Sequence, residues 1–468
     1  MAGKQSILDK LGVFSSQHSE ITCLTPSSPT FDEVRSIYAH PEITPLAIIR
    51  PTSIDDVSTA VSFLSANKIP FTIRSGGHDM HGRSMRNDAV ALDMRLLNSV
   101  RIHSIPEHEE NGEQRKMVST ATVGGGILTG DLISALQEQG FATPVPSLPA
   151  VGYVGWAMYG GYGAYSARFG LGVDQIVGAK LVDASGKVID ADQELLKAIR
   201  GAGGAFGVVV EVTVRIYRVD RILAGMIMFK SDDLATVIPE YNKAYRALAA
   251  EGLPPQLSVQ QGILNAPTPT FTVLFVWSSP DLNEGYKWLE KIKNFGPFMT
   301  TTVQETTPLG ALERAAQHFA KSTQGRMWTT SLRTITGQVA DVIADYTSRM
   351  PSDPHILFDM HELRACSPSA RPNPDSVFSA REPHFAVEIN TIVEDGEKLE
   401  EALNWGRAFR DALRKTGAEN LFPVQYLSFM REEEVDHEKI FGERVSSLRG
   451  LKERFDPDNV FKAAISYL

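Results

Sequence analysis

The chain has 468 residues, which is too long for one small hydrophobic core and predicts a protein of two domains. Its 43% hydrophobic and 22% charged residues are typical of a soluble globular protein, and no run approaches the roughly 18 apolar residues of a membrane span, so a membrane protein is excluded. The formal net charge of −10 argues against nucleic acid as a partner, because binding to phosphates depends on clustered lysine and arginine, and it favours a small neutral or cationic substrate.

The start of the chain has no apolar stretch of signal-peptide length, so we expect a cytoplasmic protein. Two cysteines, Cys23 and Cys366, lie far apart in the sequence. This spacing argues against a disulfide framework and is compatible with a reducing compartment. It also argues against a thiol-based metal site, and we expect no metal. The sequence leaves the oligomeric state open.

Strand and helix patterns alternate in the first part of the chain, up to about residue 220. Ser53 can cap a helix that runs to Leu64, and Gly140 can end a helix that starts at Asp131. Apolar extended runs predict the flanking strands and a hairpin with its turn at 184–187, which together indicate an α+β unit. The predicted strands are Ala47–Arg50, Pro70–Ile73, Val90–Asp93, Val118–Val123, Ile176–Asp183 and Val188–Asp190.

Three glycine-rich segments, 74–84, 151–163 and 200–207, fall within this part. In the first, Gly76 and Gly77 follow a strand and allow main-chain N–H groups to approach an anion closely, and His78 comes next. One such pair is usually an ordinary turn. Three together are better explained by a long dinucleotide that lies across several loops. A Rossmann-type module is disfavoured, because no Gly-x-Gly-x-x-Gly motif opens a helix in a βαβ unit.

From Ile222 onward, period-two strands are separated by helices. The runs Thr270–Trp277 and His384–Asn390 read as long strands, and Leu282–Asn294 reads as a helix. This pattern predicts an antiparallel sheet with helices on one face, and therefore a second domain. The segment 367–375, rich in proline and serine, is predicted to be a loop.

The order of these motifs resembles the berberine-bridge-enzyme-like branch of the vanillyl-alcohol oxidase superfamily. The resemblance begins at Pro45–Pro51, includes the Arg-x-Gly-Gly-His motif and 198–209, and resumes at the closing run Leu451–Phe461. It implies an α+β fold with a two-part PCMH-type FAD-binding domain and a substrate domain whose antiparallel sheet is covered by helices. The implied boundaries are 1–220 and 425–468 for the FAD-binding domain and 221–424 for the substrate domain.

The resemblance also implies the cofactor contacts. His78 would carry the covalent bond to the 8α-methyl group of FAD, although a lone histidine after a turn is more often structural. A second bond in this branch comes from a cysteine, but Leu148 holds that position here, so no cysteinyl link is expected. The residues assigned to FAD are Arg74, Ser75, Gly76, Gly77, His78, Asp79, Gly82, Ser84, Pro149, Val151, Gly152, Gly155, Gly160, Gly161, Gly163, Ile176, Gly204, Phe206, Gly207, Val208 and Asn459.

The catalytic base departs from the family pattern. A Tyr-x-Asn-Tyr run often supplies a tyrosine that faces the flavin, whereas this chain has Phe429 at the second tyrosine position and keeps Tyr426 at the first. Strand alternation places Glu388 on the face opposite to the apolar side chains of its strand, and His361 likewise on the strand 356–363. We expect Glu388 and His361, with Tyr426, to act in catalysis, although these polar side chains can equally line a wet interdomain surface.

These features together predict an oxidase that transfers a hydride from a small alcohol or amine to covalently bound FAD, with O2 as acceptor, in specialised metabolism. The missing tyrosine keeps an oxidative or non-redox cyclase open as an alternative. A protein that binds flavin without turnover is a further alternative. The substrate's identity and stereochemistry are left open.

Overall fold

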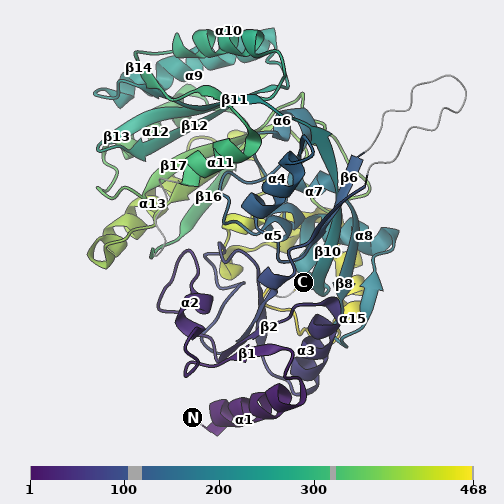
Figure 1. Ribbon diagram of the computed structural model, residues 1–468. Helices are drawn as coiled ribbons and strands as arrows, with labels where there is room; N and C mark the ends of the chain where they lie inside the picture. The colour runs from purple at the N-terminus through teal and green to yellow at the C-terminus, as the bar shows by residue number, and fades with distance from the viewer. Residues whose placement is uncertain (1, 104–118, 317–322, 466–467) are drawn as a thin grey trace, which may run out of the picture.

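The computed structural model describes residues 2–103, 119–316, 323–465 and 468, which form three β-sheets with helices packed around them (Figure 1). The predicted strand Val118–Val123 begins at a residue outside the described part and is otherwise present. No helix of the described residues is long and apolar enough to cross a membrane.

The first sheet has the strand order β1-β2-β4-β3, with β2, β4 and β3 parallel. Helix α3 connects β2 to β3, and its start is fixed by a capping box in which Ser53 accepts a hydrogen bond from the Asp56 main-chain N–H. Its inward face packs in one core with the sheet. The elements are α1 (Ala2–Gln17), β1 (Thr22–Leu24), α2 (Phe31–Arg35), β2 (Ala47–Arg50), α3 (Ile54–Ala66), β3 (Phe71–Arg74) and β4 (Val90–Asp93).

The second sheet is antiparallel and follows the order β5-β6-β10-β8-β9, with β7 paired to β10. The predicted hairpin is confirmed, because β8 and β9 pair in antiparallel register. The segment 151–163 differs from the predicted loop, since part of it forms helix α5. The elements are β5 (Val100–His103), β6 (Ser119–Gly124), α4 (Thr129–Gln137), β7 (Phe141–Ala142), α5 (Tyr153–Met158), α6 (Ser166–Phe169), α7 (Gly172–Gln175), β8 (Ile176–Val182), β9 (Val188–Asp190), α8 (Gln193–Ala202) and β10 (Val208–Arg218).

The third sheet is antiparallel with the order β14-β11-β13-β12-β17-β18-β16, and β15 also pairs with β11. Side chains of α9, α10, α12 and α13 pack against one face in a single core, which includes Phe358 of β17 and Val387 of β18. The predicted sheet with helices on one face is confirmed. The elements are β11 (Ile222–Phe229), α9 (Leu234–Glu251), β12 (Leu257–Asn265), β13 (Pro269–Trp277), α10 (Leu282–Lys293), β14 (Phe298–Thr301), β15 (Gln304–Thr306), α11 (Pro308–Ala316), β16 (Met327–Leu332), α12 (Gly337–Ser348), β17 (Leu357–Leu363), β18 (His384–Asn390) and α13 (Leu399–Leu413).

The C-terminal segment packs against the second sheet and its helices. Helices α14 (His437–Phe441) and α15 (Val445–Phe455) follow α13, and Leu448, Leu451 and Phe455 lie in the same core as Ile199 of α8. Figure 1 shows α15, in yellow, beside β8 and α8. The chain therefore returns, after the third sheet, to the part of the fold that its first half builds.

A buried ion pair fixes the end of this C-terminal segment. Lys452 donates hydrogen bonds to the Ala205 carbonyl oxygen at 2.8 Å and to the Asp456 carboxylate at 2.7 Å. The Asp456 carboxylate also accepts from the main-chain N–H groups of Val460 at 2.6 Å and Phe461 at 2.9 Å. Asp456 is 1% exposed and Lys452 6% exposed, so the pair has almost no access to water.

Lys452→Ala is expected to destabilise the protein by about 3–5 kcal/mol, because it leaves the Asp456 charge buried without its partner. Urea unfolding followed by circular dichroism measures the change. Arg454→Ala is the control, since Arg454 forms an exposed pair with Glu194 at 3.7 Å, and its loss should change stability by less than about 0.5 kcal/mol. Equal losses in the free energy of unfolding for the two substitutions would show that the buried pair does not stabilise the packing of the C-terminal segment.

Candidate active site

A cavity of about 360 Å³ lies where the three parts of the fold meet. The loop after β3, helix α5 and the segment before β10 contribute to its lining. Side chains from the face of β17 and β18 that the helices leave uncovered also line it, as do residues 426–429, Phe461, Ala463 and Ala464. Segments that are far apart in the sequence thus share one cavity.

The loop after β3 can come close to a ligand because of its glycines. A Cβ atom on Gly76 would lie 2.2 Å from the Gly152 nitrogen and 2.5 Å from the Ala150 oxygen, and Gly77 has φ 70°, so other residues would strain both positions. Within the described part of the chain, the main-chain N–H groups of Gly76, Gly77 and His78 have no hydrogen-bond acceptor. They are free to bind an anionic group such as a pyrophosphate.

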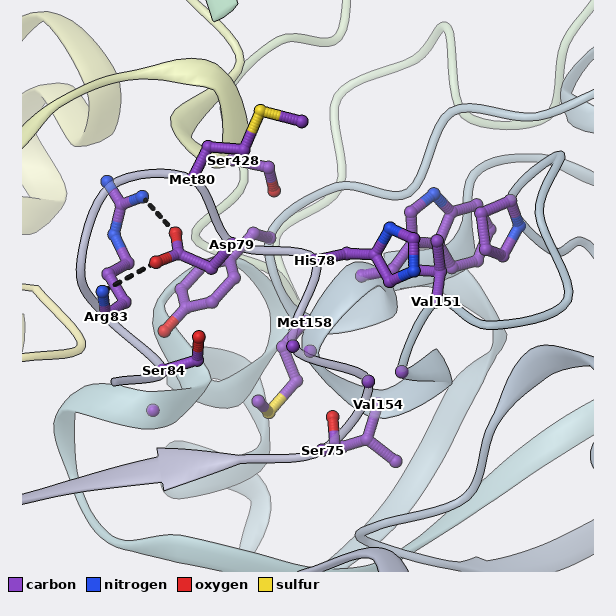
Figure 2. A pocket seen from close by; sticks show the side chains of 18 of the residues that line it. Ser75, His78, Asp79, Met80, Arg83, Ser84, Val151, Val154, Met158 and Ser428 are labelled. Carbon is purple, nitrogen blue, oxygen red and sulfur yellow. Dashed lines mark hydrogen bonds and ion pairs between the residues drawn. The ribbon is translucent and has the colours of Figure 1, made fainter. Parts of the chain in front are cut away.

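His78 projects from this loop into the cavity (Figure 2). Its ring stacks on Tyr38, with ring centroids 4.6 Å apart and planes inclined by 16°. Burial, together with the nearby Arg74 charge, lowers the pKa of His78 to about 4. The imidazole is therefore neutral at pH 7 and keeps a nitrogen lone pair, as a nucleophile requires.

Asp79 and Arg83 fix the far end of the loop, as Figure 2 shows. The Asp79 carboxylate accepts from the Arg83 main-chain N–H at 2.6 Å and from its guanidinium at 3.1 Å. Arg83 also donates to the carbonyl oxygens of Met430 at 2.7 Å and Leu427 at 3.3 Å. These hydrogen bonds of Arg83 thus connect the loop after β3 to the segment 427–430.

The structure brings many of the predicted FAD contacts together around this cavity. The predicted residues that line it are Ser75, Gly76, Gly77, His78, Asp79, Ser84, Val151, Gly152, Gly155, Gly204, Gly207 and Val208. The others lie outside its lining: Arg74, Gly82, Pro149, Gly160, Gly161, Gly163, Ile176, Phe206 and Asn459.

Several residues outside the lining have contacts within the protein instead. Arg74 is buried and donates to the carbonyl oxygens of Val34 and Ser36, each at 2.6 Å. A Cβ atom on Gly160 would lie 2.7 Å from the Phe378 ring, and one on Gly161 would lie 2.8 Å from the Gly172 Cα atom. Small residues are required at these two positions by packing, whatever the cavity binds.

The predicted catalytic residues Glu388, His361 and Tyr426 all line the cavity. His361 Nε2 lies 3.3 Å from the Glu388 carboxylate, and its Nδ1 lies 3.3 Å from the Gln260 amide nitrogen. Gln260 also donates to Asp359, at 2.5 Å. Four polar side chains from β12, β17 and β18 therefore form one hydrogen-bonded cluster, which we call the acid–base cluster, and three of them line the same cavity as His78.

Burial sets the protonation of this cluster. It raises the pKa of Asp359 to about 6. Burial alone would lower the pKa of His361, but the hydrogen bond to Glu388 and the charge of Asp359 raise it above its usual value. Tyr426 has its pKa raised to about 12 by burial, so its hydroxyl stays protonated at neutral pH and is not a base.

Three residues of the site were not predicted from the sequence. Tyr38 comes from an irregular segment near the N-terminus, and Arg83 reads in the sequence as a surface charge of the loop. Gln260 lies on β12, where the sequence contains no recognisable motif. Gln260 does share a period-two face with Ser258, opposite to the core residues Leu257 and Val259, and this was the available signal.

The ligand atoms of Asp359, His361 and Glu388 lie within 4.8 Å of one another, a spacing that a metal ion could bridge. Both ring nitrogens of His361 already have partners in Glu388 and Gln260. A cation would have to displace these contacts. The arrangement fits proton transfer better than metal binding.

Comparisons with known proteins agree with this geometry. Residues 45–192 match the model of the FAD binding domain. The FAD-linked oxidoreductase aurO of Gibberella zeae is 33% identical over 450 residues, which cover 95% of this chain and 85% of that protein. The (R)-6-hydroxynicotine oxidase of Paenarthrobacter nicotinovorans is 34% identical over 256 residues, 53% of each chain.

Solved structures share the fold. A crystal structure of 6-hydroxy-D-nicotine oxidase from Arthrobacter nicotinovorans superposes with a TM-score of 0.79 at 24% identity, covering 94% of this chain and 96% of that one. A chitooligosaccharide oxidase superposes with a TM-score of 0.76 at 20% identity, covering 96% and 97%. The fold and the matched domain define a flavoprotein with a PCMH-type FAD-binding fold. Within it, this chain belongs to the family of FAD-linked oxidoreductases.

Proposed function

We propose that this protein is an FAD-linked oxidase of the berberine-bridge-enzyme-like branch that acts on a small alcohol or amine in specialised metabolism. The supporting observation is that one cavity is lined both by the loop after β3, with its free N–H groups and His78, and by the acid–base cluster. Bound FAD would supply the oxidant for hydride transfer from the substrate carbon, with O2 as the final electron acceptor. The protein binds, orients and deprotonates the substrate.

The cofactor is proposed to be linked through His78 alone. The neutral imidazole in the cavity supports this link, and the main-chain N–H groups of Gly76 and Gly77 support binding of the pyrophosphate. Leu148 lines the same cavity at the position where the resembled branch often has a cysteine. A leucine side chain has no nucleophile, so a second covalent bond cannot form there.

The acid–base cluster is proposed to take the proton from the substrate hydroxyl or amine. The Glu388 carboxylate faces the cavity and shares a hydrogen bond with His361, so a proton gained by either group is stabilised by the other. Tyr426, which remains protonated, is suited to donate a hydrogen bond to the substrate. Phe429 lines the cavity without an acidic hydroxyl.

The cavity supports a neutral or cationic substrate. Asp359 and Glu388 bring two carboxyl groups to it, whereas the guanidinium of Arg83 is already engaged by Asp79 and by main-chain oxygens. Met327, Leu357 and Phe429 add apolar wall. An anionic substrate would meet like charge there, which is unfavourable in a partly desolvated site.

In this proposal residues 1–220 and 425–468 form the FAD-binding domain, and residues 221–424 cover the substrate. The packing of α15 against α8 supports this division.

The test is a panel of small alcohols and amines mixed anaerobically with the purified protein. Bleaching of flavin absorbance by a member of the panel, followed by release of hydrogen peroxide when air is admitted, is the expected result. Covalent FAD that no member of the panel reduces would refute an alcohol or amine oxidase. It would favour the cyclase, in which FAD serves partly as scaffold, for which Phe429 in place of tyrosine is the favouring observation.

A further inference from the structure

The third sheet is split beside the acid–base cluster. The register between β12 and β17 runs from Leu264 opposite Leu357 to Gln261 opposite Met360 and stops there. Both strands continue, β12 toward Leu257 and β17 toward Leu363. The two strands therefore part immediately after the pair that precedes Gln260 and His361, and we call the gap between them the strand fork.

The strand fork contains a small polar cavity of about 20 Å³. Among its lining residues are His361 and Glu362, which are adjacent on β17 and point to opposite faces of the sheet. The cavity therefore passes through the sheet from the active-site face to the helix-covered face. Its volume is enough for one water molecule, which needs about 10–15 Å³ measured in this way.

Arg364 gives the strand fork a polar group that lacks a partner. The side chain lines the cavity and is 9% exposed. Its Nη2 donates to the Leu257 carbonyl oxygen and to the Pro254 carbonyl oxygen, whereas Nη1 has no partner within the described part of the chain. Buried guanidinium N–H groups are normally satisfied, and a water in the strand fork is the acceptor that the geometry allows.

The two ends of this cavity carry groups that can exchange a proton. At the active-site end, His361 contacts Glu388 through Nε2 and Gln260 through Nδ1, with Asp359 bonded to the same Gln260 amide. At the other end, the half-buried Glu362 accepts a hydrogen bond from the Tyr245 hydroxyl of α9. Burial raises the pKa of Glu362, which helps this carboxylate to hold a proton transiently.

We propose that the strand fork holds one ordered water, through which the proton taken from the substrate leaves His361 for Glu362 and then for solvent. The inference rests on the proposed oxidase function. The substrate O–H or N–H bond breaks and its proton joins the Glu388–His361 pair, while the adjacent C–H bond breaks and its hydride would pass to bound FAD. In the protonated ring, Nδ1 carries a proton that the Gln260 amide nitrogen, itself a donor, does not accept. Nδ1 releases this proton to the water, and the water passes one to Glu362, so His361 is a base again before the next turnover.

The test compares two substitutions of Ser258, which lines the cavity but not the active site. Ser258→Val adds a methyl group and suits a strand, so it should fill the strand fork and displace the water. Ser258→Ala leaves the space open. Crystal structures should show a water within hydrogen-bond distance of Arg364 Nη1 in the wild type and in Ser258→Ala, but not in Ser258→Val.

In steady-state turnover with O2, Ser258→Val should lower kcat roughly tenfold, because His361 loses its proton slowly between turnovers, and should increase the ratio of kcat in H2O to kcat in D2O. The first anaerobic flavin reduction should stay at the wild-type rate. Ser258→Ala should behave as the wild type does. Glu362→Gln, which keeps the shape and the Tyr245 contact, should lower kcat with the water still in place.

Absence of the water from the wild type, or a wild-type kcat in both Ser258→Val and Glu362→Gln, would overturn the inference and leave the oxidase function intact. A water that is present in a protein whose FAD no alcohol or amine reduces would remove the proton route together with the proposed function. The two failures are therefore distinguishable.

Discussion

His78→Ala should yield a protein that still binds FAD but releases it on acid denaturation. The N–H groups of Gly76 and Gly77 that face the cavity belong to the main chain and survive the substitution, so part of the cofactor affinity remains. Flavin reduction should slow roughly tenfold, which is about 1.4 kcal/mol in activation free energy, because an unlinked flavin is harder to reduce. Acid precipitation followed by fluorescence of the pellet measures the link, and stopped-flow absorbance measures the rate.

His81→Ala provides the matched control. His81 lies three positions along the same loop but does not line the cavity, so this variant should keep yellow fluorescence on the polypeptide. A flavin peptide from the wild type should contain His78. If the wild type releases all its FAD in acid, or if the His78→Ala pellet remains fluorescent, the proposed single link is wrong.

Short-range sequence patterns predicted which side chains of a strand face the core and where the glycine-containing loop after β3 lies. The alternation along 384–390 separated Phe385, Val387 and Ile389, which pack in the helix-covered core, from Glu388 and Asn390, which line the cavity. The adjacent glycines after β3 likewise marked the loop that carries His78. In both cases neighbouring residues in the sequence contain the whole signal.

Contacts between segments that are distant in the sequence could not be predicted from such local patterns. Arg83 is recognisable as part of the site only once the segment 427–430 is known to lie beside it, more than three hundred residues away in the sequence. A glycine can be required either because a loop at the cavity needs a small residue or because a neighbouring side chain packs against it. The sequence alone does not distinguish these two requirements. At Gly76 the reason is contact between two loops that border the cavity, whereas at Gly160 it is the Phe378 ring.

Glu388→Gln and His361→Ala should each keep covalent FAD while slowing anaerobic flavin reduction by about 100-fold or more, the contribution expected of a true base. Neither residue contacts the His78 loop through a hydrogen bond in the described part of the chain, so attachment of the cofactor should not depend on them. His355→Ala is the control, because His355 forms a comparable pair with Glu394 at 3.1 Å outside the cavity and its loss should leave reduction unchanged.

The pH dependence separates a base from a group that only shapes the cavity. His361 must be unprotonated to accept a proton, so the wild-type reduction rate should rise with pH and level off above the pKa of His361, which lies above its ordinary value. Glu388→Gln removes the carboxylate whose hydrogen bond raises that pKa, so the midpoint of the rise should move to lower pH. Unchanged reduction rates in both variants, or a midpoint that does not move in Glu388→Gln, would remove these residues from proton transfer and leave the redox step of the proposed function without a base.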